Sequence, residues 1–130
     1  MFKNIMIVDD SATARMITRR CLEIGGYQDA IFVEAANGRE ALEKVKDNAV
    51  DLFIVDLNMP VMDGEALLKR IKSNPKLTHV PVLIVTSLSS ADRRADLVAM
   101  GAFDVLSKPI SPASLTGVLG SFKAGEGWEA

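Results

Sequence analysis

Four short runs of consecutive apolar residues recur along the chain, and each is followed within a few residues by a segment with helical periodicity. The runs are residues 5–8, 31–33, 52–55 and 82–85. Apolar runs without polar alternation are typical of strands buried on both faces, as in a parallel sheet covered by helices. A weaker fifth strand is predicted at residues 103–107, where Asp104 interrupts the apolar run.

Polar residues and glycines predict where the helices between these strands begin and end. Ser11 is expected to cap the first helix and Gly25-Gly26 to end it. The inward stripe of this helix is predicted to be Ala14, Ile17, Cys21 and Ile24. The next three helices are preceded by Asn37, by Asp63-Gly64 and by Ser90, and the fifth starts at Ser111-Pro112. The chain therefore alternates strand and helix five times.

Five strand–helix units of about 25 residues each predict an α/β fold with a doubly wound, five-stranded parallel sheet. The expected strand order is the flavodoxin-like 2-1-3-4-5, with five helices. Residues 1–122 are expected to form the single domain, and residues 123–130 a flexible, glycine-containing C-terminal tail. In such sheets a ligand binds beyond the carboxyl ends of the strands, where the winding reverses between the first and third strands.

Composition and charge narrow the function classes. The chain is 48% hydrophobic and 25% charged, which is ordinary for a globular domain. The net charge of −2, with scattered basic residues, argues against direct nucleic-acid binding. No apolar run approaches the roughly 20 residues of a membrane-spanning helix. Cys21 is the single cysteine and the start lacks a signal-peptide pattern, so a cytoplasmic location is predicted.

Polar residues gather at the predicted carboxyl ends of the strands. They are Asp9, Asp10, Asp56, Thr86, Ser87 and Lys108. Each alone has an ordinary explanation, such as a helix cap, a strand threonine or a solvated lysine. Jointly they favour a functional site, because chance rarely places all these groups at one edge of a sheet. Crowded carboxylates repel one another unless a cation lies among them, so the cluster predicts a bound metal.

The donor set indicates which metal and which chemistry to expect. Oxygen ligands without a nearby His or Cys suit a hard cation, and an open site with few carboxylates favours Mg²⁺ over Ca²⁺. A carboxylate also acts as a nucleophile toward a phosphoryl group when a metal and a lysine neutralise the charges. Lys108 and Thr86 would then supply the remaining donors.

Four motifs together make the chain resemble the receiver domain of response regulators, especially stand-alone CheY-like proteins. They are IVDD at 7–10, VDLNMPVMDG at 55–64, VTS at 85–87 and KPI at 108–110. The resemblance covers nearly the whole chain. It implies that Asp56 is the phospho-acceptor and that Mg²⁺ is bound by Asp10 directly, by Asp9 largely through water, by Asp56 and by the Asn58 main-chain carbonyl.

The resemblance also implies how the phosphoryl group is held. Lys108 and the Thr86 hydroxyl would each bind a phosphoryl oxygen, and main-chain N–H groups of Leu57, Asn58 and Ser87 would complete the cradle. Pro109 resembles the family's cis-proline, which aims Lys108 at the site. Pro60 and Gly64 resemble turn residues that shape the loop after the third strand.

The implied function is that of a phospho-accepting response regulator in a two-component system of chemotaxis or phosphorelay type. A histidine kinase or phosphotransfer protein would donate the phosphoryl group. A target protein would then bind the face made by the fourth helix, the fifth strand and the fifth helix. Val105 departs from the pattern, because many relatives carry a switch tyrosine or phenylalanine there. At most, self-phosphorylation and autodephosphorylation are expected as activities.

Two other classes of function fit the sequence less well. A haloacid-dehalogenase-like phosphatase also uses a strand-end aspartate and Mg²⁺, but it needs a second aspartate two residues later. Asn58 occupies that position, so no general acid is evident. A nucleotide-binding domain is disfavoured because the chain has neither a G-x-x-x-x-G-K-[ST] nor a G-x-G-x-x-G stretch.

Overall fold

The computed structural model describes residues 2–87 and 90–127, with side chains as far as residue 121. The elements in chain order are β1 (Asn4–Val8), α1 (Ala12–Leu22), the π-helical turn η1 (Glu23–Tyr27), β2 (Ile31–Ala35), α2 (Gly38–Lys44), β3 (Leu52–Asp56), α3 (Gly64–Ser73), β4 (Val82–Thr86), α4 (Ala91–Ala99), β5 (Asp104–Ser107) and α5 (Pro112–Gly127). Each predicted strand is present, with bounds shifted by one or two residues at most.

The five strands form one parallel sheet in the order β2-β1-β3-β4-β5, which confirms the predicted topology. Val8 at the end of β1 pairs with Ala35 on one side and Val55 on the other. At the far side of the sheet, Thr86 pairs with Ser107. The carboxyl ends of the strands therefore lie at one edge of the sheet.

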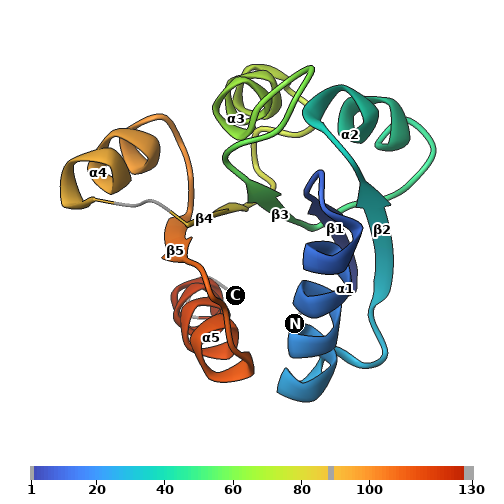
Figure 1. Cartoon of the computed structure of the whole chain (residues 1–130), viewed down its shortest axis with the longest axis vertical. Helices are drawn as coiled ribbons and strands as arrows, with labels where there is room; N and C mark the ends of the chain where they lie inside the picture. The colour runs from blue at the N-terminus through green and yellow to red at the C-terminus, as the bar shows by residue number, and fades with distance from the viewer. Residues whose placement is uncertain (1, 88–89, 128–130) are drawn as a thin grey trace.

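Helices cover both faces of the sheet, with α1 and α5 on one side and α2, α3 and α4 on the other (Figure 1). Side chains alternate along β1 between the two resulting cores. Ile5 and Ile7 pack with the α1 and α5 residues, whereas Met6 and Val8 pack with the α2, α3 and α4 residues. This burial on both faces explains why the strands are uninterrupted apolar runs.

Each helix has a side-chain cap at the position that the sequence indicated. The accepting oxygens belong to Ser11, Asn37, Asp63, Ser90 and Ser111, and the donors are the main-chain N–H groups of Ala14, Glu40, Ala66, Arg93 and Ser114. Gly101 follows α4 at φ 111°, a left-handed conformation that glycine adopts without steric cost. These local signals were sufficient to predict the helix starts.

The predicted inward stripe of α1 is wrong at two positions. Ile17 and Ile24 are 47% and 59% exposed, while Thr18 and Leu22 are buried. The buried face of the helix is shifted by about one residue from the predicted stripe, so that Thr18, Cys21 and Leu22 face the protein interior. A Cβ on Gly25 would lie 2.4 Å from Thr116 Cγ2 of α5, so the turn after α1 approaches α5 closely.

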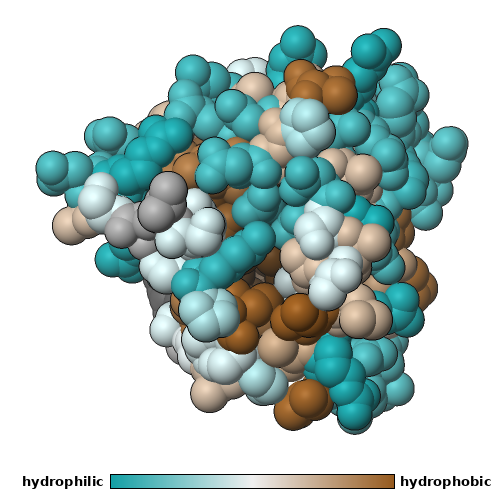
Figure 2. Space-filling view, in the orientation of Figure 1, coloured by the Kyte–Doolittle hydropathy of each residue, from teal (hydrophilic) through white to brown (hydrophobic). Residues whose placement is uncertain are grey.

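The face seen in Figure 2 is mostly hydrophilic, with apolar side chains exposed in separate spots. None of the helices within residues 2–87 and 90–127 combines the length and apolar character that a bilayer-spanning segment needs. α5 continues to Gly127, and residues 128–130 lie outside the described residues. The boundary between domain and tail at residue 122 stays a prediction.

Candidate functional site

Three aspartates meet where the neighbouring strands β1 and β3 end. Asp9 and Asp10 directly follow β1, and Asp56 is the last residue of β3. One carboxylate oxygen from each lies within 4.8 Å of the other two. Asp9 and Asp56 are buried, at 5% and 8% exposure, whereas Asp10 is exposed. The cluster therefore has two buried walls and one side open to solvent.

Lys108 reaches this cluster from the loop after β5. Its Nζ lies 3.1 Å from Asp9 Oδ2 and 3.1 Å from Asp56 Oδ1. The Lys108 N–H donates to the Thr86 carbonyl at 2.8 Å, which fixes the start of the loop to the end of β4. The peptide bond between Lys108 and Pro109 is cis. One ammonium group thus bridges two of the three carboxylates.

The electrostatics of the cluster reflect burial and crowding. Burial raises the pKa of Asp56, the hydrogen bond from Lys108 opposes this, and the charges of Asp9 and Asp10 raise it further. Burial alone would lower the pKa of Lys108, but its hydrogen bonds and charge interactions with Asp9 and Asp56 outweigh this and raise it. The charged form of Lys108 is therefore favoured. The charged form of Asp56 is disfavoured, because the lysine only partly offsets burial and the two neighbouring carboxylates.

These groups fit a hard divalent cation. All three side chains offer carboxylate oxygens, and the exposed side at Asp10 leaves room for water or a phosphoryl oxygen, as Mg²⁺ requires. Lys108 supplies one positive charge against three negative ones, so an excess of negative charge remains for a cation to neutralise.

The loop between β3 and α3 packs against the main chain at the end of β3, next to Asp56. The Gly64 N–H donates to the Leu57 carbonyl at 2.9 Å, and a Cβ on Gly64 would lie 2.5 Å from the Asp56 carbonyl oxygen. Only glycine allows this approach. Val61 has φ 68° and is 74% exposed, an unusual conformation for a β-branched residue in a loop next to the carboxylates.

The other predicted site residues occupy the same edge of the sheet. Thr86 is fully buried at the end of β4, and Asn58 and Ser87 are exposed in the loops after β3 and β4. The Leu57 N–H differs from expectation, because it donates to Val85 O at 3.1 Å and continues the sheet's hydrogen bonding. This N–H is therefore already engaged by the sheet.

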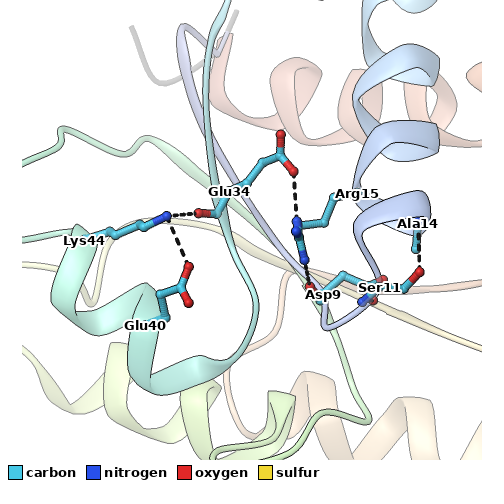
Figure 3. A network of polar contacts seen from close by, with 7 residues as sticks. All are labelled: Asp9, Ser11, Ala14, Arg15, Glu34, Glu40 and Lys44. Carbon is cyan, nitrogen blue, oxygen red and sulfur yellow. Dashed lines mark hydrogen bonds and ion pairs between the residues drawn. The ribbon is translucent and has the colours of Figure 1, made fainter.

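Two residues that the sequence did not suggest hold Asp9 in place (Figure 3). Arg15 Nη1 donates to the main-chain oxygen of Asp9 at 2.6 Å, and its Nε donates to Glu34 Oε1 at 2.8 Å. On the other side, the Ser11 N–H donates to Asp9 Oδ1 at 2.9 Å. A side chain that binds a distant main-chain carbonyl leaves no motif, so Arg15 and Glu34 could not have been found from spacing.

Comparison with known proteins agrees with this geometry. The family model of the response regulator receiver domain matches residues 5–119. The chain is 33% identical over 112 residues to chemotaxis protein CheY1 of Helicobacter pylori, covering 85% of this chain and 89% of that protein. It is 38% identical over 117 residues to the transcriptional regulatory protein ZraR of Escherichia coli K12, covering 89% of this chain but only 25% of ZraR. The chain thus spans about a quarter of such longer regulators.

Solved structures show the same fold. The chemotaxis response regulator CheY4 of Vibrio cholerae superposes with a TM-score of 0.81 at 32% identity, covering 93% of this chain and 98% of CheY4. CheY in the CheX-CheY-BeF3-Mg²⁺ complex of Borrelia burgdorferi superposes with a TM-score of 0.81 at 28% identity, covering 92% of this chain and 88% of that one.

Proposed function

Because this chain belongs to the response regulator receiver family, we propose that it accepts a phosphoryl group on Asp56 from a phosphohistidine of a partner kinase or phosphotransfer protein. The observation that carries the proposal is the convergence of three carboxylates, with one oxygen of each within 4.8 Å of the others, and of Lys108, whose Nζ lies 3.1 Å from two of them. The order of the strands brings these residues together at the carboxyl ends of β1, β3 and β5.

The chemistry is an in-line transfer. A carboxylate oxygen of Asp56 forms a bond to phosphorus while the bond from phosphorus to the histidine nitrogen of the donor breaks. Asp9, Asp10, Asp56 and the Asn58 carbonyl would hold a Mg²⁺ ion, which would supply positive charge to the transferring group. Hydrolysis of the acyl phosphate by water returns Asp56 to its carboxylate form.

Lys108 and Thr86 each donate a hydrogen bond to a phosphoryl oxygen. Lys108 bridges Asp9 and Asp56, so its ammonium already lies beside the nucleophilic carboxylate. As charge moves onto the phosphoryl group, the ammonium follows it from Asp56. The Thr86 hydroxyl and the Asn58 and Ser87 N–H groups then donate to the remaining oxygens as preorganised donors.

The output is phosphorylation-dependent binding of a target protein at the face made by α4, β5 and α5. Thr86 pairs with Ser107 of β5, and Arg94 of α4 forms an ion pair with Asp104 of β5 at 2.6 Å. Movement of Thr86 is therefore transmitted to this face through β5. Val105 is 8% exposed and packs in the core, so this coupling runs without the aromatic switch of many relatives.

The proposed phospho-accepting role does not include repeated hydrolysis of phosphomonoester substrates. The haloacid-dehalogenase-like alternative draws no support from the family match or from the relatives named above. The protein would act on itself only, by self-phosphorylation and autodephosphorylation, in the cytoplasm and without contact to nucleic acid. Its pathway would be chemotaxis or a phosphorelay.

Incubation with Mg²⁺ and acetyl phosphate tests the proposal. We expect intact-protein mass spectrometry to show one added phosphoryl group, lost at high pH and absent from Asp56→Asn. Repeated hydrolysis of a chromogenic phosphomonoester would instead indicate the phosphatase. Labelling of Asp56→Asn at the wild-type rate would show that another residue is the acceptor.

A further inference from the structure

Arg15 contacts the main chain of Asp9, one of the three clustered aspartates, and the mechanism above gives it no role. Its guanidinium joins the Asp9 main-chain oxygen to the Glu34 carboxylate, at 2.6 and 2.8 Å (Figure 3). We propose that Arg15, oriented by Glu34, is a positioning residue that fixes the Asp9 main chain and thereby sets the affinity of the pocket for its divalent cation. This inference rests on the proposed function, which supplies the cation.

The main chain at Asp9 needs such an anchor because it leaves the sheet there. Val8 makes the last pairs of β1, with Ala35 and Val55. The Asp9 N–H still donates to Ala35 O at 3.0 Å, but its carbonyl accepts from the Arg15 side chain. Arg15 thus continues the hydrogen bonding of the strand at the point where Asp9 and Asp10 turn into the pocket.

Arg15 stands where an arginine is otherwise unfavourable. It is the fourth residue of α1, and a cation near a helix N-terminus costs roughly 0.3–1 kcal/mol. Its side chain is only 17% exposed, so its charge also loses hydration. Two hydrogen bonds offset these costs, because Nη1 donates to the Asp9 main-chain oxygen and Nε donates to Glu34 Oε1.

A side chain of helix α2 in turn binds the main chain of Glu34. Lys44 of α2 donates to the Glu34 main-chain oxygen at 2.5 Å and forms an ion pair with Glu40 at 3.1 Å. Helix α1, strand β2 and helix α2 therefore meet behind Asp9, as Figure 3 shows. The Glu34 carboxylate balances the charge of Arg15 and accepts from its Nε, which orients the guanidinium with Nη1 toward the Asp9 main-chain oxygen.

Two effects of Arg15 on cation binding have opposite signs. Its positive charge alone would repel Mg²⁺, so its removal would tighten binding. Its anchoring of Asp9 favours binding, and loss of a residue that orients a metal ligand typically weakens metal affinity 10–100-fold. Because Glu34 neutralises the guanidinium at 2.8 Å, the anchoring effect is the larger one. Removal of Arg15 should therefore weaken Mg²⁺ binding.

Calorimetric titration of the metal-free protein with Mg²⁺ measures this directly. Arg19→Gln is the matched control, because Arg19 lies one turn later on α1 and contacts Glu23 at 3.7 Å and the Phe32 ring at 4.9 Å. We expect Arg15→Gln to bind Mg²⁺ roughly tenfold more weakly, and Arg19→Gln to bind like the wild type. Equal or tighter binding by Arg15→Gln would overturn the inference.

The role of Glu34 and of the guanidinium shape is tested with three further variants. Glu34→Ala should weaken Mg²⁺ binding, and the double variant Arg15→Gln/Glu34→Ala should bind no more weakly than Arg15→Gln alone. Additive losses would show that Glu34 does not act through Arg15. Arg15→Lys keeps the charge but lacks the planar fork, so it should remain several-fold weaker than wild type. Full recovery with lysine would overturn the positioning role.

A metal-free measurement separates this inference from the proposed function. Without Mg²⁺, Arg15→Gln should accelerate amide hydrogen exchange at Asp9, whose N–H is bonded to Ala35 O, while Arg19→Gln leaves it unchanged. A wild-type protein that binds no Mg²⁺ would refute the proposed function and this inference together. Wild-type binding with unaltered affinity and exchange in Arg15→Gln would refute the inference alone.

Discussion

At the scale of one residue, the buried carboxylate of Asp56 lowers the stability of the fold but suits the proposed phosphoryl transfer. Its side chain is 8% exposed, and burial raises its pKa despite the hydrogen bond from Lys108. The charged form is therefore costly in the metal-free protein. The same excess of negative charge would attract a divalent cation, and the cation would then allow a negatively charged phosphoryl group to approach this carboxylate.

Replacing Asp56 by asparagine should stabilise the metal-free protein at pH 7. A carboxyl group whose pKa is raised by folding contributes stability below its unfolded pKa and loses it as the pH rises through the folded pKa. Asparagine removes the charge at similar size, so we expect Asp56→Asn to have a higher free energy of unfolding than the wild type. Urea unfolding without Mg²⁺ at pH 7 measures it. The gain should shrink toward pH 4, and a less stable Asp56→Asn at pH 7 would contradict the reasoning.

Gly64 shows a second constraint at the residue scale. Alanine there would place a Cβ 2.5 Å from the Asp56 carbonyl oxygen, a clash that backbone movement must relieve. We expect Gly64→Ala to lower the free energy of unfolding by about 1–3 kcal/mol and to slow labelling by acetyl phosphate.

A glycine of α5 provides the matched control for this substitution. A Cβ on Gly117 would meet nothing within 4 Å. Gly117→Ala should therefore gain up to about 1 kcal/mol from helix propensity and leave labelling unchanged. Equal effects of the two substitutions in denaturant unfolding and labelling would show that the close approach at Gly64 is unimportant.

At the scale of elements, local signals predicted the helix starts but not every helix orientation. Caps such as Ser11 and Asn37 act within three residues, so they are visible in the sequence. The orientation of α1 depends on its contacts with the sheet and α5. Spacing could not distinguish a stripe through Ile17 from one through Thr18, and apolar character favoured the wrong one.

Two alanine substitutions test the orientation of α1. Leu22 is fully buried, and its truncation should cost about 2–5 kcal/mol through lost burial and a cavity. Ile17 is 47% exposed, so Ile17→Ala should cost less than about 1 kcal/mol. Denaturant unfolding compares them. A larger loss for Ile17→Ala than for Leu22→Ala would favour the stripe that the sequence suggested.

At the scale of the molecule, the sheet topology assembles the pocket from distant residues. Lys108 and Asp9 are 99 positions apart, yet their side chains lie 3.1 Å apart. The sequence predicted this meeting because parallel strands align their carboxyl ends and the strand order follows from handedness rules. It could not predict the contacts of Arg15, which depend on how α1 and β2 pack, or the engagement of the Leu57 N–H by Val85.

Binding of Mg²⁺ should stabilise the whole domain in a pH-dependent way. An ion that binds only the folded state adds about 1.4 kcal/mol at a concentration tenfold above its dissociation constant. Protons compete for the same carboxylates, and Asp56 has a raised pKa, so the added stability should be full at neutral pH and fall as the pH drops through that pKa.

Urea unfolding with MgCl₂, against NaCl of equal ionic strength, measures this added stability between pH 4 and 7.5. Asp10→Asn removes the exposed carboxylate of the cluster and should reduce the gain at every pH. A gain that is independent of pH, or one that NaCl reproduces, would place Mg²⁺ outside the three carboxylates.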